Sequence, residues 1–385
     1  MIKINDPKLF DNIVLDDHLT SLIHSKVPFA NRPRREININ ELGNKVLTFE
    51  EMSQYTQSNS WRLVALASRN SIINTHESQT NTILQYWALR LISLVQLKQL
   101  RIASKELVQL ETIFKDHFDS LNTQNTHTHT KQNSWLSDWP FELVLLRAHI
   151  PMLTSNDIDL AINRICELIE LNENNMLYIS PKITQKDQKD LVTKNRSKQL
   201  EVNLVGLLLN EKNYDLAIDV LEKQSRRDPK NTQIMSFLGR VYLQAGCISK
   251  AYSSFVTVSE MIPNDIVNST NWGYYNVALG NWEQAKESFS NAINYQDGDA
   301  NYSLINNIAV CDLYMGNAPV MLQNLQRVMQ EMPSTAGTDE ALIFNYCSAV
   351  ELGCSGSWQQ SLKIQKMIDV GQWAGDGFDT SVFKL

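Results

Sequence analysis

Two histidines and a group of arginines are the first residues whose type and spacing could support chemistry. His127 and His129 lie two positions apart in a stretch rich in threonine and asparagine, and imidazole is a common ligand of transition metals. An H-x-H pair supplies only two ligands, so a metal site would need others from elsewhere. Arg32, Arg34 and Arg35 could contact phosphate, but no interleaved aromatic residues or recognised nucleic-acid motif accompany them. We therefore expect no metal, no cofactor and no nucleic acid to bind.

The cysteines and carboxylates form no recognisable catalytic set. The five cysteines are odd in number and include no C-x-x-C pair, so neither a zinc knuckle nor a disulfide framework is indicated. We expect them to be small core residues in a reducing compartment. The sequence also lacks G-x-S-x-G, H-E-x-x-H and phosphate-binding glycine motifs. We predict that the protein is not an enzyme and has no catalytic residue.

Composition and charge favour a folded, helical protein. The 385 residues are 43% hydrophobic and 20% charged, with 35 Lys and Arg against 42 Asp and Glu and a net charge of −7. This balance is ordinary for globular proteins and too acidic overall for a nucleic-acid-binding protein. The 14 glycines and 10 prolines are too few turn formers for a many-stranded β protein. The N-terminus lacks the apolar core of a signal peptide and no long apolar run follows, so we expect neither secretion nor a transmembrane segment.

A repeat of 34 residues organises the second half of the chain. Ala217, Ala251 and Ala285 recur at that spacing, as do Pro229 and Pro263, and this period is typical of paired helices. The register predicts units at 198–231, 232–265, 266–299 and 302–335. Weaker copies fall near 84–117 and 142–175, and apolar residues between 342 and 364 supply a seventh helix pair.

The recurring residues are those that two closely crossing helices require. Helices approach where a side chain is absent or is a single methyl group, and bulky side chains fill the remaining space. The pattern is that of a tetratricopeptide repeat. We predict an all-α fold, a right-handed α-solenoid of about seven tetratricopeptide-like helix pairs. Its defining residues are Trp87, Ala217, Pro229, Gly239, Tyr242, Ala251, Phe255, Pro263, Gly273, Ala285, Phe289 and Pro333.

The repeat also suggests how the chain is divided. Residues 1–59 show little periodicity and are predicted to be a partly irregular N-terminal arm, followed by a first helix near Trp61. Residues 60–368 are predicted to form the solenoid, with polar surface inserts at 119–138 and 174–197 because helical patterning resumes on each side of them. Residues 369–385 are predicted to be a tail that packs on or near the last repeat.

The first helices of the pairs line the concave face of such a solenoid, which is its expected binding surface. A carboxylate clamp would need cations converging from adjacent units, and the inner positions supply only one arginine. Mixed polar and aromatic side chains there suit peptide or subunit recognition, although each could instead simply be solvated. The predicted partner-binding residues are Gln233, Ser236, Arg240, Thr270, Tyr274 and Asn306, together with Phe378 and Phe383 in the tail.

Four stretches resemble a known family. They are 84–91 (LQYWALRL), 139–148 with its WPF and LRA segments, 306–316 (NNIAVCDLYMG) and the terminal 375–385 (GDGFDTSVFKL). The terminal stretch is the most specific, because repeat geometry gives no reason for it after the last helix pair. In matching order from about residue 60, the chain resembles the subunit-twelve family of the TRAPP (trafficking protein particle) vesicle-tethering complex, whose members are tetratricopeptide-repeat proteins.

The resemblance implies a non-catalytic scaffold subunit. Such a subunit works beside a small TRAPP core that activates a Rab-family GTPase, so its own link to the GTPase is indirect. The implied partners are other TRAPP subunits, particularly the large peripheral ones. The implied roles are traffic between endoplasmic reticulum and Golgi, and autophagy. The implied location is cytoplasmic and peripheral, at Golgi and ER–Golgi intermediate membranes.

Two other kinds of function stay open at this stage. The first is a general tetratricopeptide adaptor that binds peptides in its concave groove. The second is an enzyme or nucleic-acid binder that uses residues 1–50 or 119–138. Recovery together with TRAPP subunits would support the tether subunit. Loss of peptide binding on substitution of Arg240 or Tyr274 would support the adaptor, and a phosphate- or metal-dependent thermal shift would support the enzyme or nucleic-acid binder.

Overall fold

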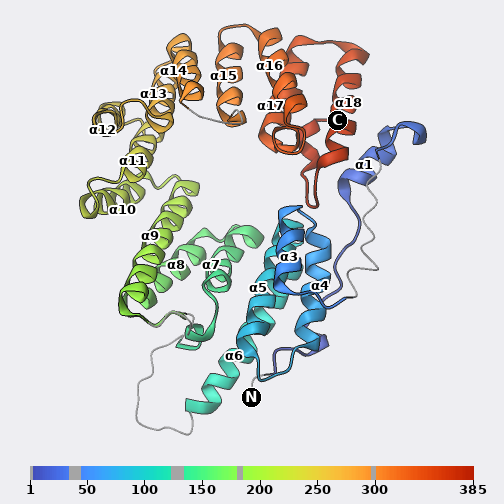
Figure 1. Ribbon diagram of the computed structural model, residues 1–385, viewed down its shortest axis with the longest axis vertical. Helices are drawn as coiled ribbons and strands as arrows, with labels where there is room; N and C mark the ends of the chain where they lie inside the picture. The colour runs from blue at the N-terminus through green and yellow to red at the C-terminus, as the bar shows by residue number, and fades with distance from the viewer. Residues whose placement is uncertain (1–2, 34–44, 123–133, 180–184, 296–300) are drawn as a thin grey trace. The chain divides into compact units, whose positions relative to one another are not determined.

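The computed structural model describes residues 3–33, 45–122, 134–179, 185–295 and 301–385, and every regular element within them is a helix (Figure 1). The prediction of an all-α arrangement of helix pairs is confirmed. His127 and His129 and most of the 119–138 insert lie outside the described residues, as do Arg34 and Arg35. No helix in the described ranges is long and apolar enough to cross a membrane.

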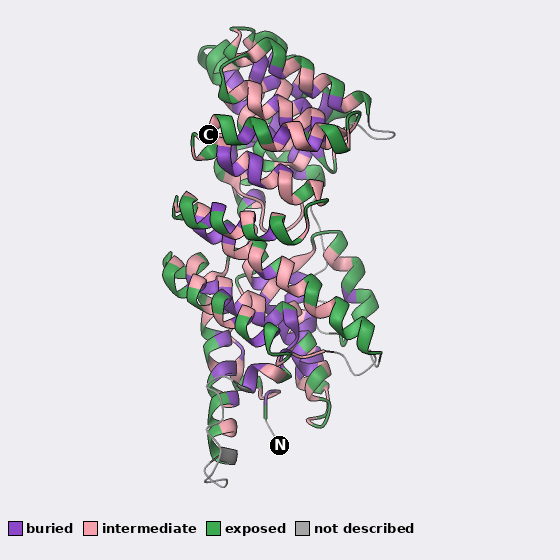
Figure 2. Cartoon of the chain, turned by 90° about the vertical axis from the view of Figure 1, so that its left-hand side faces the viewer, coloured by how far each residue is buried: buried purple, intermediate pink, exposed green. Residues whose placement is uncertain are grey.

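Contacts divide the chain into two compact units, each with its own core. Unit 1 comprises Met1–Asp17, Glu36–Glu211 and Gly375–Gly377, and unit 2 comprises His18–Arg35, Lys212–Ala374 and Phe378–Leu385. The predicted solenoid of 60–368 is thus divided between residues 211 and 212. In both units the buried residues follow the helix faces that are turned toward neighbouring helices (Figure 2).

Unit 1 is built from successive antiparallel helices. They are α3 (Phe49–Gln57), α4 (Trp61–Asn74), α5 (Thr80–Gln96), α6 (Leu100–Asn122), α7 (Phe141–Ser155), α8 (Ile158–Glu173) and α9 (Lys186–Asn210), with short 3-10 turns at Pro7–Leu9 and Ser134–Asp138. The predicted pairs near 84–117 and 142–175 correspond to α5–α6 and α7–α8. A helix, α4, does begin at Trp61, but the prediction that it is the first one is wrong, because α3 precedes it.

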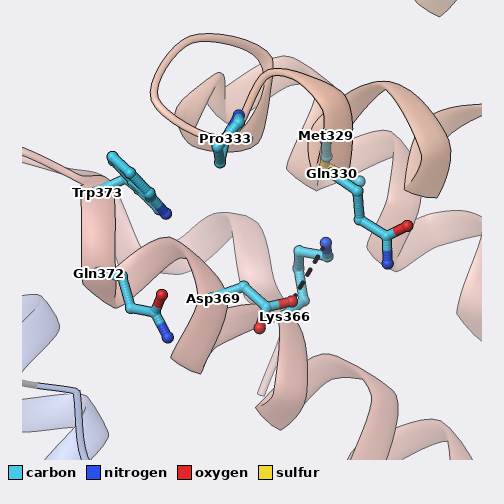
Figure 3. Close-up of a pocket in the computed structure, with 8 residues that line it drawn as sticks. Met329, Gln330, Pro333, Lys366, Asp369, Gln372 and Trp373 are labelled. Atoms are coloured by element: carbon cyan, nitrogen blue, oxygen red, sulfur yellow. Dashed lines mark ion pairs between the residues drawn. The ribbon is translucent and has the colours of Figure 1, made fainter.

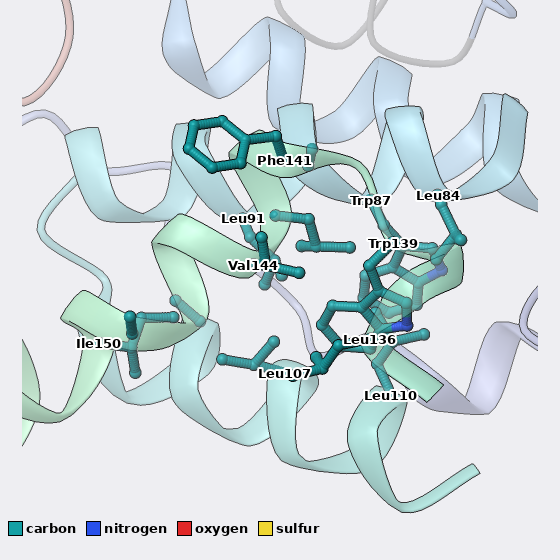
Figure 4. Packing of buried hydrophobic residues seen from close by; sticks show 14 of the residues in the cluster. Leu84, Trp87, Leu91, Leu107, Leu110, Leu136, Trp139, Phe141, Val144 and Ile150 are labelled. Carbon is teal, nitrogen blue, oxygen red and sulfur yellow. The ribbon is translucent and has the colours of Figure 1, made fainter. Parts of the chain in front are cut away.

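Two tryptophans, one in the middle of α5 and one just before α7, lie in the core of unit 1 (Figure 4). Trp87 on α5 and Trp139 before α7 are both fully buried. Trp87 stacks on Phe10, with ring centroids 4.7 Å apart, and Trp139 meets Phe114 edge-on at 5.5 Å. Each large buried side chain of this kind contributes about 1.5–3 kcal/mol to folding.

Two predicted boundaries in unit 1 need correction. The start of the predicted N-terminal arm is packed into this unit, because Trp87 donates a hydrogen bond to the carbonyl of Ile4 (3.0 Å) and Ile4 is buried. The 174–197 insert is also not a surface excursion throughout, because α9 begins at Lys186 and packs on α8. Asn172 of α8 donates to the carbonyl of Thr193 (2.9 Å), so polar side chains fasten this helix where an apolar stripe is missing.

Both end segments of the other predicted insert, 119–138, lie within the described residues. Helix α6 continues to Asn122, and the 3-10 turn Ser134–Asp138 buries Trp135 and Leu136 in the core. The tryptophan explains why the turn docks, since its ring packs against Trp139 at 5.1 Å. The prediction of a polar surface insert is therefore corrected for these end segments.

Unit 2 continues the helix pairs and is capped by an N-terminal helix. It begins with the single helix α10 (Tyr214–Arg227). The pairs that follow are α11 (Thr232–Gln244) with α12 (Ile248–Met261), α13 (Ile266–Ala278) with α14 (Trp282–Asn294), α15 (Tyr302–Tyr314) with α16 (Ala318–Glu331), and α17 (Glu340–Gly353) with α18 (Gly356–Trp373). Helix α1 (His18–Lys26) packs on α18 through Leu19 and Ile23, both fully buried (Figure 1). This part of the predicted N-terminal arm, 1–59, is therefore helical and packed in a core.

The glycines of the repeat in unit 2 lie where two helices cross closely or where the backbone turns. A Cβ atom at Gly239 would lie 2.3 Å from the Phe255 ring, and one at Gly273 would lie 2.3 Å from the Phe289 ring. Glycine is therefore what lets each pair of helices cross. Gly246, at the turn within the first of these pairs, has a φ of +76° that favours glycine.

The predicted helix stops also lie where proline requires them. Helices α10, α12 and α16 end at Arg227, Met261 and Glu331, in each case two residues before Pro229, Pro263 or Pro333. The remaining repeat-defining residues, Ala217, Tyr242, Ala251 and Ala285, are all buried.

Candidate functional site

The candidate site is the surface formed by the first helices of the pairs in unit 2, α11, α13, α15 and α17, which we term the first-helix face. Polar side chains join each of these helices to the next. Asn271 on α13 donates to the Ser236 hydroxyl on α11 (2.8 Å), and Asn307 on α15 donates to the Tyr274 hydroxyl (3.4 Å). Asn345 on α17 then donates to the side-chain oxygen of Asn306 (2.9 Å).

Asn271 holds the centre of this network. It is fully buried, and its side-chain oxygen accepts a hydrogen bond from Nε of Arg240 (3.0 Å). An amide can donate and accept at once, so Asn271 fixes both Ser236 and Arg240. The contact aims the rest of the guanidinium group along the face, where it lies 5.1 Å from the centroid of the Tyr274 ring.

Arg240 differs electrostatically from the buried arginines of unit 1. Arg90 pairs with Glu106 and Arg147 with Glu111, whereas in the described chain no carboxylate lies within ion-pair distance of Arg240. Burial lowers the pKa of the Arg240 guanidinium, and the Tyr274 side chain partly opposes that shift. The arginine still carries its charge, because its ordinary pKa is so high. It is a half-buried cation with no fixed counter-charge.

A cavity of about 420 Å³ adjoins this cation. Its walls come from the C-terminal halves of α11 and α13, and they are mostly apolar apart from Arg240 and Gln244. The lining residues are Arg240, Leu243, Gln244, Tyr274, Val277 and Ala278. A cavity with one cation, one aromatic ring and apolar walls can hold an acidic or carbonyl-bearing segment of another chain.

Some of the predicted binding residues face the cavity or solvent, and others bond to helices of this chain. Arg240 and Tyr274 line the cavity, and Gln233 is exposed. Ser236 is buried, and Asn306 accepts a bond from Asn345, so both join helices of this chain.

Thr270, Phe378 and Phe383 make contacts within unit 2. Thr270 turns its hydroxyl onto the Ile266 carbonyl of its own helix (2.6 Å). Phe383 is fully buried and Phe378 packs beside it, 5.6 Å between centroids. As placed, Phe383 offers no surface to a partner, and its role here is to anchor the tail on α17.

Sequence reasoning missed the three asparagines that build the network. Asn271, Asn307 and Asn345 each come from a different first helix. A signal was present for two of them, since Asn271 follows Thr270 and Asn307 follows Asn306 in the sequence. It was hidden because asparagine at an inner position is equally typical of a solvated surface.

Comparison with known proteins adds a relationship in sequence. No family model matches the chain. Over 329 residues, four-fifths of this chain, it is 26% identical to a mouse protein described as trafficking protein particle complex subunit 12. The human protein of that description is 25% identical over 326 residues. The chain therefore resembles trafficking protein particle complex subunit 12.

The resemblance predicted from four short stretches is confirmed by these matches. The chain spans about two-fifths of the length of the curated relatives it matches, 40% of the mouse protein and 43% of the human one. What the rest of those proteins does is therefore not carried over to this chain.

Two of the solved structures that the chain partly matches are described as tetratricopeptide-repeat proteins. One from Parabacteroides merdae matches with a TM-score of 0.44 and 13% identity, covering 78% of this chain and 96% of its own. One from Thermus thermophilus matches with a TM-score of 0.38 and 17% identity, covering 54% and 97%. The superpositions are partial, so the fold assignment rests on the helix pairs themselves.

Proposed function

We propose that this chain is a non-catalytic scaffold subunit of a trafficking protein particle complex. The observation that carries the proposal is the sequence likeness to subunit 12 over four-fifths of the chain. Helix pairs support the same role, because stacked pairs give a long surface of fixed geometry on which other proteins can assemble.

In this role the chain binds other subunits of the complex, particularly the large peripheral ones. Its link to a Rab-family GTPase is indirect and runs through the core that activates the GTPase. It supports traffic between endoplasmic reticulum and Golgi, and autophagy, and it reaches Golgi and intermediate membranes from the cytoplasm as part of the complex. These roles extend the resemblance stated above and are open to test.

The first-helix face of unit 2 is the surface we assign to one of these partners. A stable contact buries about 800 Å² on each side, and such contacts are enriched in arginine and tyrosine. Arg240 and Tyr274 supply that pair at the cavity, and Gln233 lies at the exposed start of the same helix. Ser236 and Asn306 join neighbouring first helices, whereas the Thr270 hydroxyl bonds within its own helix.

Affinity purification of the tagged full chain, followed by identification of the proteins recovered with it, tests the proposal. We expect several trafficking protein particle subunits in stoichiometric amounts. Recovery of the chain as a free monomer would contradict the scaffold role.

Substitutions then test the assigned surface. Arg240→Gln with Tyr274→Ala should reduce recovery of one subunit, while Arg226→Gln should not, because Arg226 is exposed and pairs only with Glu222 among the residues described. Equal recovery with both variants would remove the first-helix face from the proposal without affecting the scaffold role.

A general peptide adaptor is the second candidate, and the uncompensated charge of Arg240 is the observation that favours it. An array of nine-residue peptides probed with the full chain would show discrete, acidic binders. Arg240→Gln should erase those signals while complex assembly persists. Signals that also survive Arg240→Glu would exclude the cavity as a peptide site.

A further inference from the structure

A second, smaller pocket lies near the C-terminal end of unit 2, away from the first-helix face residues described above. It has a volume of about 230 Å³ and lies between α16, α18 and the turn after α16 (Figure 3). Sites for drug-sized ligands usually exceed about 300 Å³, so this pocket suits one or two amino-acid side chains. It is lined by Met329, Gln330, Pro333, Gly337, Lys366, Asp369, Gln372 and Trp373.

Lys366 on α18 is the unusual member of this set. The residue is 5% exposed, and its ammonium group points into the space between Gln330 and Trp373 (Figure 3). Its carboxylate partner is Asp369, with 3.5 Å between Nζ and Oδ2. That is longer than the 2.7–2.9 Å of a charge-assisted hydrogen bond. The nitrogen also faces the Tyr346 ring at 5.2 Å.

An ammonium group has three N–H donors, and the residues the structure describes give the Lys366 nitrogen no hydrogen bond. Burying a charge is costly unless hydrogen bonds replace those of water. The Lys366 ammonium group is thus held by the Asp369 ion pair and the Tyr346 ring, and its N–H donors, which no described protein group accepts, are open to the pocket.

Lys363, one helical turn earlier, shows that α18 can satisfy a buried lysine. It is 4% exposed, and its Nζ donates to Glu351 (2.6 Å) and to the carbonyl of Lys384 (2.9 Å). The two lysines share a helix and a degree of burial and differ in their partners. Burial on α18 does not by itself explain why Lys366 lacks hydrogen bonds.

The remaining lining groups indicate what completes the site. Gln330 and Gln372 offer amide donors, and Trp373 at the rim is 54% exposed, as is common for an aromatic residue that anchors an interface. Asp369 is 47% exposed at its side chain, so water screens its charge more than that of buried Lys366. The pocket thus favours a small group rich in acceptors, next to apolar atoms that can cover the indole.

We propose that this pocket binds the carboxylate of a glutamate or aspartate side chain from a partner subunit. The carboxylate oxygens accept the hydrogen bonds that Lys366 lacks, and the partner's adjacent apolar atoms cover Trp373. The proposal rests on the scaffold role proposed above and names the chemistry of one of its contacts.

The first test uses the full chain labelled with ¹³C at its methionine methyl groups, because Met329 lines the pocket and is buried. The probe is N-acetyl-glutamate N-methylamide, and the matched neutral probe is its glutamine counterpart. We expect the glutamate probe to shift the Met329 signal, the glutamine probe to leave it in place, and Lys366→Met to weaken the response at least tenfold. An equal response to both probes, or none to glutamate, would overturn the proposal.

Thermal melting separates a binding role from a structural one. Lys366→Met keeps the apolar stem and removes a poorly bonded charge, so its melting temperature should equal or exceed that of the parent chain. Lys363→Met should lower it, because Glu351 loses its closest partner and the Lys384 carbonyl a donor. A decrease for Lys366→Met as large as that for Lys363→Met would mean that Lys366 is structural, and the proposal would fail.

Purification of the complex links the pocket to its partner. We expect Lys366→Met to reduce the recovery of at least one subunit relative to the parent chain. If the parent chain recovers no subunits, the scaffold role fails whatever the probe does. If it recovers them and Lys366→Met recovers them equally, the scaffold role stands and the assignment of this pocket to a subunit is overturned.

Discussion

Asp376 in the terminal segment gives the sharpest test of how the chain is held together. Its side chain is 2% exposed, and its Oδ1 accepts from Nε of Arg62 (2.8 Å). Its Oδ2 accepts from the backbone N–H of the same residue (2.8 Å), which is one of the free donors at the start of α4. A single carboxylate therefore neutralises a buried arginine and caps a helix that begins more than 300 residues earlier in the chain.

The change we consider is Asp376→Asn, which keeps an acceptor for the cap and removes the charge. Breaking a buried ion pair by removing one partner costs about 3–5 kcal/mol, because the other charge is left uncompensated. Asp11→Asn is the matched control, since its carboxylate pairs with Lys105 where both side chains are substantially exposed. A pair of that kind is worth about 1 kcal/mol or less.

Hydrogen exchange measured by mass spectrometry is the appropriate assay, because two units need not unfold in one transition. A loss of 3 kcal/mol corresponds to roughly a hundredfold faster exchange for amides protected by opening of α4. Peptides from α12 in unit 2 serve as an internal reference. The reasoning is refuted if Asp376→Asn exchanges like Asp11→Asn.

Three further predictions concern packing and thiol chemistry. Gly239→Ala should lower the free energy of unfolding in denaturant by about 1–3 kcal/mol, because the new methyl group would collide with the Phe255 ring. Gly206→Ala is the control: no heavy atom lies within 4 Å of where its Cβ would be, so it should raise that free energy by up to about 1 kcal/mol. In native protein at pH 8, a thiol reagent should label exposed Cys166 and leave Cys347 unlabelled until denaturant is added, since burial raises the pKa of the Cys347 thiol to about 11. Because the unfolded thiol loses its proton first, the stabilising contribution of Cys347 should be lost as pH rises from about 9 to about 11, and Cys347→Ala should flatten that part of a melting-temperature profile.

Local regularities of sequence were enough to predict the helix pairs. Gly239 and Phe255 lie sixteen positions apart within one repeat, and a repeat constrains both at once. The crossing they form in the structure is the one their sizes require. The same holds for the proline stops, since each acts on the helix directly before it.

Contacts between distant segments could not be predicted in this way. Nothing near Arg62 in sequence indicates that its partner is Asp376, and nothing near Leu19 indicates that α1 packs on α18. Such contacts depend on where the repeat brings separate segments, and one sequence carries no periodic signal for them. The specificity of the GDGF segment is explained only once Gly377 is seen against the Gln96 carbonyl, 2.1 Å from where a Cβ would lie.

The sequence predicted which helix face carries the candidate site, but not which of its residues bond within the chain and which line the cavity. The register placed Ser236 and Arg240 on the same helix face, and the structure shows one buried in a network and the other at a cavity. The difference arises from Asn271, whose amide bonds both residues. The residue types at 236 and 240 do not indicate that Asn271 bonds to both side chains, or that Ser236 is buried while Arg240 lines the cavity.

Whether a buried charge has hydrogen-bonding partners within the chain is therefore a more useful criterion for finding contact surfaces in this protein than residue type at a repeat position. Arg62, Arg90 and Lys363 are buried and bonded to carboxylates, which accounts for them as parts of the fold. Arg240 is half-buried and Lys366 is 5% exposed, and beside a cavity both side chains keep donors that no described protein group accepts. Arg240 bonds to Asn271 and Lys366 pairs with Asp369, but each retains donors without a described protein acceptor, and removing such donors from water costs free energy. That free-energy cost is offset when another chain supplies hydrogen-bond acceptors, as a partner of the proposed scaffold subunit would.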